Sequence, residues 1–401
     1  MSNKNSIFKL HGKVQHYDWG GFDYIPQLLG IENKKHEPFA EYWLGAHDKA
    51  SAQLQTGEPL NHLLQQEPEL LGERVKERFG RLPYLFKILD VKNMLSIQVH
   101  PNKQAAISSF EKENQSGIAT NAPNRNYKDD NHKPELMVAL SDFWLLHGFQ
   151  TPAALKKTIG LVPEFSFMWP VFETKGYRGL YELLMTMDQN KVNETLQPLL
   201  QRIIPLYQSG TLKKNNPDFW AARAALSYSA SGKTDRGIFS IYLFNILNLK
   251  EGEAIFQDAG ILHAYLEGQN VEIMANSDNV LRGGLTTKHI DVPELMKHVS
   301  FLAVEPVIIR GKVNNKNEMV FVTPAPDFEL GRIEINSNET YAVNSISTDI
   351  FFVFSGSLEA SAGDTRFALK RGESFVAFSH TAIKLQAIAD TVLFRASVPV
   401  N

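Results

Sequence analysis

Short segments in which apolar and polar residues alternate fill the C-terminal part of the chain, and they limit its fold more than any other feature. Between about residues 312 and 401 they include EMVFV, FELGRIEI, IFFVFSG, GESFVAF and TVLFRASV. Successive side chains of a strand point to opposite faces, so each segment can bury one face and expose the other. Many short strands at regular spacing are typical of a β-sandwich or a β-barrel. Because long helices do not alternate with these strands, a doubly wound parallel sheet is not expected.

The rest of the chain contains two further kinds of sequence. Residues 238–268 form another series of short strands separated by glycines, whereas residues 151–234 carry leucines at helical spacing. At 401 residues the chain is longer than one hydrophobic core usually supports. We therefore predict three parts: residues 1–150 together with 235–311 as one β domain, residues 151–234 as a helical insertion, and residues 312–401 as a second β domain. The insertion has no recognisable site, and packing is its expected role.

Local patterns before residue 151 predict a few individual elements. Residues 61–79 have helical spacing, and Pro68 is expected to divide them into two short helices. Residues 82–90 are predicted to form a strand, and residues 104–115 a helix. Because Lys87 interrupts the apolar segment at 82–90, we expect its side chain to lie in a site or at a sheet edge.

Composition argues against several classes of function. The formal net charge is −3, so a general electrostatic attraction to nucleic acid or to an acidic membrane surface is not expected. Apolar runs fall short of the roughly 20 residues that span a bilayer, and the N-terminal segment lacks the apolar core of a signal peptide. The chain has no cysteine, so a metal would be bound by histidine, carboxylate or amide groups. We expect a cytoplasmic protein.

The stretch KNMLSIQVHPN at residues 92–102 is the strongest candidate for a site. It is rich in strand-forming residues and ends at a proline. With a period of two, Ser96, Gln98 and His100 share one face of the strand, while apolar residues share the other. A hydroxyl, an amide and an imidazole in a row suit the wall of a cavity, although a polar stripe facing solvent explains the same pattern.

Two more segments supply groups that bind metals. Residues 252–263 resemble the second cupin motif, with Asp258 at the usual proline position, and Glu135 opens an apolar strand. A related segment at residues 372–380 lacks the histidine spacing, so the second β domain is expected to hold no metal. Two histidines, a carboxylate and an amide oxygen can bind a borderline divalent ion without sulfur. The candidate donors are Gln98, His100, Glu135 and His263.

Several longer blocks of the sequence resemble one enzyme family. YDWG, AEYWLGAH, SIQVHPNK, NYKDDNHKPEL, HAYLEG and MANSDNVLRGGLT resemble the type I phosphomannose isomerases, in that family's order, between about residues 14 and 296. The resemblance implies a mainly β fold of cupin-type jelly-roll barrels with an inserted α-helical domain. It also implies a zinc-dependent aldose–ketose isomerase that interconverts mannose 6-phosphate and fructose 6-phosphate through a cis-enediol, with one zinc ion per chain.

The resemblance also implies which residues form the site. The family's zinc ligands fall on the four candidate donors, and its essential arginine falls on Arg282. Departures from the family are small: Gly283 and Gly284 stand where alanine–glycine is frequent, and Ala259 stands where a threonine or a proline-bearing turn is common. Neither departure removes a functional group. The family's active-site region also covers Trp19, Glu41, Lys87, Ser96, His132, Lys133, Glu272 and Asp278.

Residue chemistry suggests roles in proton transfer. Arg282 keeps its proton at ordinary pH, so we expect it to stabilise the enediolate or the phosphate and not to act as a base. Lys133 and Glu272 are alternative bases, because burial and neighbouring charges can bring the pKa of either toward neutrality. His132 is expected to assist ring opening as an acid or a base.

The phosphate and the sugar ring require further contacts. Ser96 and Lys87 are expected to hold the phosphate dianion, since Ser96 shares a strand face with two metal-ligand candidates. Trp19 is expected to pack against the barrel, with a wall for the sugar as the alternative. The expected partner is therefore a small sugar phosphate, with no nucleic acid and no membrane, and the expected oligomeric state is a monomer.

Two other functions would use a similar site. A sensor of sugar phosphates would keep the metal and phosphate groups and lose the proton-transfer groups, and the presence of Lys133, Glu272 and Arg282 favours the enzyme. An iron oxygenase would use two histidines and a carboxylate. The amide ligand Gln98 and the phosphate-binding candidates argue against that reading.

Overall fold

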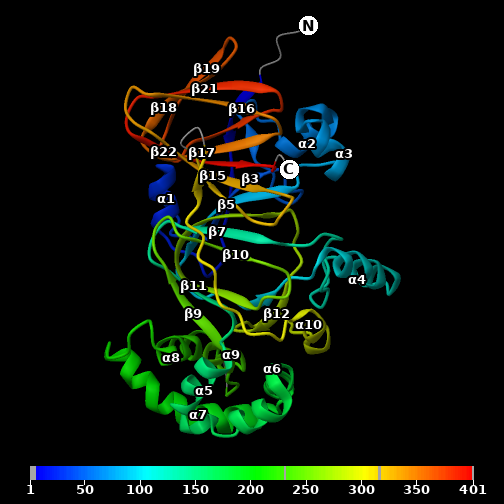
Figure 1. The fold of residues 1–401 in the computed structure, drawn as a ribbon, viewed down its shortest axis with the longest axis vertical. Coiled ribbons are helices and arrows are strands. Elements are labelled where there is room, and N and C mark those ends of the chain that lie inside the picture. The colour runs from blue at the N-terminus through cyan, green and yellow to red at the C-terminus, as the bar shows by residue number, and fades with distance from the viewer. Residues whose placement is uncertain (1–5, 230–231, 315–317, 400–401) are drawn as a thin grey trace.

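The computed structural model describes residues 6–229, 232–314 and 318–399, and it has three parts along its long axis (Figure 1). A C-terminal β domain lies at one end, a β-barrel lies in the middle, and a group of helices lies at the other end. The predicted class, mainly β jelly-roll barrels with an inserted α-helical region, is confirmed. Among the described residues, no helix combines the length and the apolar character that crossing a bilayer requires.

The central barrel is built from an antiparallel sheet around one long strand, β11 (His263–Ala275). This strand pairs with β5 and β7 along its second half and with β6 and β8 near its start, so it links both sides of the barrel. The other strands are β2 (Lys13–Gln15), β3 (Glu41–Gly45), β5 (Tyr84–Val91), β6 (Ile97–Val99), β7 (Glu135–Ala139), β8 (Phe143–Phe149), β9 (Phe244–Leu249), β10 (Ala254–Gln257) and β12 (Leu281–Gly284).

The C-terminal domain is a sandwich of two antiparallel sheets whose facing apolar side chains form a separate core. The larger sheet has the order β13-β14-β15-β22-β17-β20-β1-β4, and the smaller has the order β16-β21-β18-β19. Their bounds are β1 (Ile7–His11), β4 (Gln53–Leu54), β13 (Lys312–Val313), β14 (Glu318–Phe321), β15 (Glu329–Ile335), β16 (Thr340–Ser345), β17 (Asp349–Ser355), β18 (Ser357–Ala362), β19 (Thr365–Lys370), β20 (Ser374–Ala377), β21 (Thr381–Ala387) and β22 (Thr391–Ser397).

The first described strand belongs to this C-terminal sandwich. β1 pairs with β20, with Ile7 opposite Ala377, and β4 pairs with β1. This pairing differs from the prediction that residues 1–150 belong to the other β domain. A pairing between strands so far apart in the chain has no local sequence signal, because each strand presents only its own apolar face.

Helices α5 to α9 form the third part of the molecule, and the other helices lie beside the two β domains (Figure 1). The helices of the insertion end at Leu243, so the helical region extends beyond the predicted residue 234. The bounds are α1 (Tyr24–Leu29), α2 (Leu60–Gln66), η1 (Pro68–Leu71), α3 (Glu73–Phe79), α4 (Lys103–Gln115), α5 (Pro152–Gly160), η2 (Pro163–Phe165), α6 (Met168–Thr186), α7 (Gln189–Gln208), α8 (Pro217–Tyr228), α9 (Gly237–Leu243) and α10 (Val292–His298).

Most of the predicted local elements are present. The helical segment at 61–79 is interrupted at Pro68, the strand at 82–90 is β5, and the helix at 104–115 is α4. The stretch at 92–102 is strand only over Ile97–Val99, which is shorter than predicted. Its partners β11 and β12 pair only with residues 97–99, so the flanking residues are left as irregular chain.

The helical insertion contacts the chain just before β6. The Arg223 guanidinium and the Tyr228 hydroxyl, both on α8, donate to the main-chain oxygens of Lys92 and Met94. Arg223 and Lys214 also form ion pairs with Glu267 on β11. These contacts tie the main chain at Lys92 and Met94 to the helical insertion.

Candidate active site

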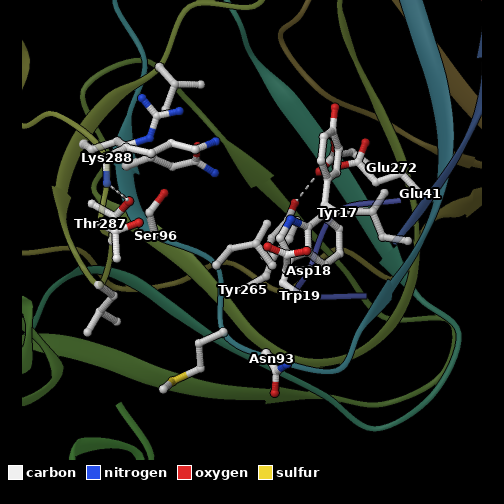
Figure 2. Close-up of a pocket in the computed structure, with 18 of the residues that line it drawn as sticks. Tyr17, Asp18, Trp19, Glu41, Asn93, Ser96, Tyr265, Glu272, Thr287 and Lys288 are labelled. Atoms are coloured by element: carbon white, nitrogen blue, oxygen red, sulfur yellow. Dashed lines mark hydrogen bonds between the residues drawn. The ribbon is translucent and has the colours of Figure 1, made fainter. Parts of the chain in front are cut away.

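A cavity of about 920 Å³ opens into the central barrel. Its wall is formed by β3, β5, β6, β7, β11 and β12, by the loops at residues 16–19, 93–96 and 285–288, and by the end of α8. Figure 2 shows two groups of polar side chains facing each other across this space. Ser96, Thr287 and Lys288 lie on one side, and Glu41 and Glu272 lie on the other.

Strand β6 separates its polar and apolar side chains as its alternating sequence predicts. Ile97 and Val99 are fully buried in the core beneath the strand, whereas Ser96 and Gln98 line the cavity. Gln98 lies opposite His263 of β11 and opposite Arg282 of β12. Sheet register therefore brings an amide, an imidazole and a guanidinium together at this wall.

Three metal-binding side chains meet behind the cavity wall. His100, Glu135 and His263 are between 0% and 2% exposed, and their ligand atoms all lie within 4.8 Å of one another. Each histidine Nε2 lies 3.4 Å from an oxygen of the Glu135 carboxylate. This cluster contains three of the four predicted ligands, and Gln98 lies next to it through its pairing with His263.

The second nitrogen of each histidine ring fixes how the ring faces the cluster. Nδ1 of His100 donates to the main-chain oxygen of Asn279 at 2.8 Å, and Nδ1 of His263 donates to that of Ile261 at 2.9 Å. A carbonyl oxygen can only accept, so in the neutral ring the proton is on Nδ1 and Nε2 carries a lone pair. Burial lowers the pKa of His100 to about 4, which keeps that ring neutral.

The cluster leaves buried polar atoms unsatisfied. Nε2 of His100, Nε2 of His263 and Oε2 of Glu135 make no hydrogen bond with any described residue. Two lone pairs facing a carboxylate in a buried space repel one another, and a bound cation would remove this cost. The donor set of imidazole and carboxylate groups suits a borderline divalent metal. The residues present therefore fit a zinc ion.

Lys133 contacts the same carboxylate from the cavity side. Its Nζ lies 2.9 Å from Oε1 of Glu135. Burial alone would raise the pKa of Glu135, but the ammonium group of Lys133 holds it well below its usual range. Glu135 is therefore ionised, as a metal ligand must be.

The acidic end of the cavity is a buried network around Lys87. Nζ of Lys87 lies 3.2 Å from Oε1 of Glu272 and 3.4 Å from Oε2 of Glu41. Burial alone would lower the pKa of Lys87, but these two carboxylates hold it above its usual range. The Tyr265 hydroxyl donates to Oε2 of Glu272 at 2.8 Å (Figure 2). Burial raises the pKa of Glu272, against the effect of Lys87.

The opposite end of the cavity carries positive charge. Lys288 lies here with the hydroxyls of Ser96 and Thr287 (Figure 2). Arg282 also lines the cavity, close enough to Lys288 for the two charges to interact. Burial lowers the pKa of Arg282, and partial burial together with Arg282 lowers that of Lys288. Unlike Lys87, Arg282 forms no ion pair within the described part of the chain. This end is therefore an uncompensated cationic site with hydroxyl donors.

Asp278 and the aromatic residues complete the wall. Asp278 accepts from Lys49 and lies 3.5 Å from the His47 ring, and these contacts lower its pKa although burial opposes the shift. Trp19 stacks with Tyr17, with ring centroids 5.9 Å apart, and both line the cavity. Trp19 also packs against the barrel core, and its role as a wall for the sugar stays a prediction.

The sequence matches members of a known enzyme family along almost the whole chain. A family profile, phosphomannose isomerase type I catalytic domain, matches residues 7–152. Mannose-6-phosphate isomerase from Escherichia coli is 35% identical over 94% of this chain and 96% of its own length. The human mannose-6-phosphate isomerase is 31% identical over 97% of this chain and 98% of its own.

The chain belongs to the mannose-6-phosphate isomerase family.

Solved structures of the family have the same fold. Mannose 6-phosphate isomerase from Salmonella typhimurium, in a crystal structure with fructose 6-phosphate and zinc bound, matches with a TM-score of 0.88 and 32% identity. That match covers 99% of this chain and all of the other. A zinc-bound structure of a mannose 6-phosphate isomerase matches with the same TM-score.

Most of the predicted site residues line the cavity of this mannose-6-phosphate isomerase family member. Trp19, Glu41, Lys87, Ser96, Gln98, Lys133, Glu135, Glu272, Asp278 and Arg282 line it, and His100 and His263 lie behind Glu135. His132 does not line it. Its Nε2 lies 2.9 Å from Oδ2 of Asp327, which is in the loop before β15 of the C-terminal domain.

Several residues of the cavity wall have no clear signal in the sequence. Tyr265 follows His263 by two positions on β11, so the period of two could have placed it on the same side. Thr287 and Lys288 lie on a loop after β12, where no periodic signal exists. Ser227 and Tyr228 come from α8 in the helical insertion, which was expected to serve packing alone.

Proposed function

We propose that this chain interconverts mannose 6-phosphate and fructose 6-phosphate as a zinc-dependent aldose–ketose isomerase. One observation carries the proposal: a buried cluster of unsatisfied metal-binding atoms lies at the wall of a cavity that has a cationic end and an acidic end. Membership of the family and the bound substrate and zinc in the Salmonella structure support the same reaction.

We propose that His100, Glu135, His263 and Gln98 hold one zinc ion per chain. One carboxylate and three neutral ligands leave a zinc ion with a net positive charge. When bound, zinc would supply Lewis-acid polarisation of a substrate oxygen. The hydrogen bonds at Nδ1 of both histidines support this assignment, because they present both Nε2 atoms to one point.

The phosphate is assigned to the cationic end of the cavity. Lys288 and the hydroxyl of Ser96 are the proposed donors, and charge-assisted hydrogen bonds of this kind are stronger than neutral ones. Lys87 was expected to share this role, but two carboxylates already surround its ammonium group. Arg282 lies opposite Gln98. We therefore propose that its guanidinium stabilises the negative charge that develops on the substrate next to the metal ligands.

The reaction requires a proton to leave C2 of the open-chain aldose and a proton to be added at C1, while another moves from O2 to O1. Lys133 and Glu272 are the candidates for the carbon base, and both line the cavity. The raised pKa of Glu272 suits a carboxyl that accepts and returns a proton. Lys133 contacts Glu135, so its charge also holds that ligand ionised. The position of His132, against Asp327, favours a structural contact over the predicted part in ring opening.

An exchange experiment distinguishes the two bases. In deuterated water, the enzyme should exchange the C2 hydrogen of mannose 6-phosphate with solvent. Glu272→Gln and Lys133→Met are each compared with Glu41→Gln, a control that also removes a carboxylate partner of Lys87. If one of the two variants binds substrate but no longer exchanges the C2 hydrogen, the residue changed in it is the base. The Glu41→Gln control should still exchange this hydrogen.

We also propose how the chain is organised. Residues 1–150 with 235–311 would form the catalytic domain, residues 151–234 the helical insertion and residues 312–401 the C-terminal domain, with β1 and β4 added to the last of these by pairing. We propose a cytoplasmic monomer. Light scattering after size-exclusion chromatography tests the oligomeric state, and the mass of one chain, 45.2 kDa, is expected.

Turnover tests the proposed function as a whole. Mannose 6-phosphate should be converted to fructose 6-phosphate by the zinc-loaded protein. Tight binding of metal and sugar phosphate without turnover would replace the proposal with a sensor of sugar phosphates.

A further inference from the structure

A hydrogen-bond network next to the metal cluster joins residues 127–131 to residues 277–279, and Asp129 lies at its centre. Oδ1 of Asp129 accepts from the Ser277 hydroxyl at 2.7 Å, from the Asn131 main-chain nitrogen at 2.9 Å and from Nδ2 of Asn279 at 3.2 Å. Oδ2 accepts from the main-chain nitrogen of Asp278 at 2.7 Å. Both carboxylate oxygens are therefore committed to donors on two separate segments. None of these bonds has a part in the proposed chemistry.

Asn279 makes the complementary half of the network. Its Oδ1 accepts from the main-chain nitrogens of Lys128 at 2.7 Å and Asp129 at 3.3 Å. Its Nδ2 donates to the main-chain oxygens of Asp129 at 2.8 Å and Asn131 at 2.9 Å. The residue is only 1% exposed, so water cannot replace these bonds without opening the structure. The side chain thus fixes where its own main-chain carbonyl lies.

That carbonyl is the partner of a metal-ligand candidate. The main-chain oxygen of Asn279 accepts from Nδ1 of His100 at 2.8 Å. A partner at the second nitrogen sets the tautomer and the orientation of a ligating histidine. The same network holds Asp278 at the cavity wall, and residues 127–131 lead directly to Lys133 and Glu135.

We propose that Asp129 is a positioning residue for the zinc site. It holds the segment at 277–279 in place, so that the Asn279 carbonyl keeps His100 in the tautomer and orientation that present Nε2 to the metal. Asp129 itself lies outside the cavity wall and outside the cluster of ligands. The inference rests on the proposed zinc site and adds a residue that controls its affinity.

Asp129→Asn changes the network with almost no change in volume. An amide has one acceptor oxygen, and its NH₂ group is a donor. In either orientation the NH₂ group therefore faces an N–H donor, either the Asp278 main-chain nitrogen or the Asn131 main-chain nitrogen and the Asn279 amide. Asp130→Asn is the matched control, since it removes a neighbouring charge from an exposed side chain.

The experiment measures metal binding directly. Zinc affinity of the full chain is determined by competition with a chromophoric chelator, and the visible spectrum of the cobalt-substituted protein reports the ligand geometry. Outer-shell changes around metal ligands typically lower affinity by about 10- to 100-fold. We expect a loss in this range and an altered cobalt spectrum for Asp129→Asn, and we expect Asp130→Asn to match the unaltered protein in both.

Three results would overturn the inference. These are unchanged zinc affinity with an unchanged cobalt spectrum in Asp129→Asn, an equal loss in Asp130→Asn, and a lowered melting temperature as the sole change in Asp129→Asn. If Asp129→Asn does not fold, Ser277→Ala removes one donor from the same carboxylate, and a smaller loss of zinc affinity is expected; unchanged affinity there overturns the inference as well. If the unaltered protein itself binds no zinc, the proposed function fails, a result distinct from all of these.

Discussion

The central barrel and the C-terminal sandwich each bury a cluster of charged groups, but the two clusters differ in how far they are satisfied. In the barrel, Nε2 of His100, Nε2 of His263 and Oε2 of Glu135 have no hydrogen-bond partner among the described residues. In the sandwich, Arg395 donates to Asp349 at 2.7 and 3.0 Å and to Glu318 at 3.3 Å.

The comparison shows that burial alone does not identify a site. Asp349 and Glu318 are as buried as Glu135, with 0%, 3% and 2% exposure. Arg395 forms an ion pair with each of the two carboxylates, and hydroxyls of Tyr341 and Ser347 add hydrogen bonds to Glu318 and Asp349. The sandwich cluster is complete without a ligand, whereas the barrel cluster is complete only with a cation.

The two arginines differ in the same way. Burial lowers the pKa of Arg282, which has no carboxylate partner among the described residues, while Asp349 and Glu318 raise that of Arg395 against the effect of burial. We call His100, Glu135 and His263 the open cluster, and Glu318, Asp349 and Arg395 the closed cluster. A group in the open cluster or the cavity should be needed for function, and a group in the closed cluster for folding.

The largest effect is expected from His263→Ala. The change removes one of the proposed ligands, so zinc affinity should fall by more than about 100-fold, beyond the range typical of outer-shell changes. Isomerase activity should be lost with the metal. Metal analysis and a turnover assay on the same sample check this, and an active variant without zinc would contradict the assigned site.

Arg282→Ala should remove turnover and leave the metal in place. The guanidinium is proposed to stabilise charge that develops during the reaction, and loss of one such donor typically costs about 10²- to 10³-fold in kcat. Zinc content should stay at one ion per chain, because Arg282 is not among the proposed ligands. If zinc is lost together with activity, Arg282 acts through the metal site and the assigned role is wrong.

Arg395→Met should have the opposite outcome. It leaves Asp349 and Glu318 buried without their cation, and such a loss typically destabilises a protein by about 3 to 5 kcal/mol. Urea unfolding measures the change in the free energy of unfolding. At a temperature where the variant is folded, KM and zinc content should be unchanged.

A matched triple variant sharpens this result. Adding Asp349→Asn and Glu318→Gln to Arg395→Met removes the unpaired charges and should recover part of the lost stability. If Arg395→Met alone has normal stability and reduced zinc content, the C-terminal cluster belongs to the metal site. The division between the barrel and the sandwich would then be wrong.

Lys288→Ala should have the smallest effect. This lysine lies at the solvent side of the cationic end, where one charged contact is worth about 1 kcal/mol. We expect KM for mannose 6-phosphate to rise by about fivefold, with little change in kcat. Steady-state kinetics check this, and a large loss of kcat with unchanged KM would move the phosphate to another part of the cavity.

The sequence predicts the open cluster better than the closed one. Alternation along residues 92–102 places Ser96, Gln98 and His100 on one face, and the cupin-like motif and the strand opened by Glu135 add His263 and Glu135. The Arg395 cluster has no such signal, since Glu318, Asp349 and Arg395 lie on β14, β17 and β22, and only sheet pairing brings them together.

The same limit explains the other differences between sequence and structure. Pairing of β1 with β20 and the contact between His132 and Asp327 each join segments that are distant in the chain. Lys288 lies on a loop, and Tyr228 enters the cavity from an insertion with an ordinary helical pattern. Local periodicity shows which face of an element is buried, and it does not show what the element is buried against.

Turnover before and after metal removal tests the central claim most directly. The protein is assayed for conversion of mannose 6-phosphate to fructose 6-phosphate as purified, after treatment with a chelator, and after zinc is added back. The account predicts activity, its loss, and its return at one zinc ion per chain. Full activity in protein shown to be free of metal would contradict the claim that the buried cluster of His100, Glu135 and His263 is the metal centre of the isomerase.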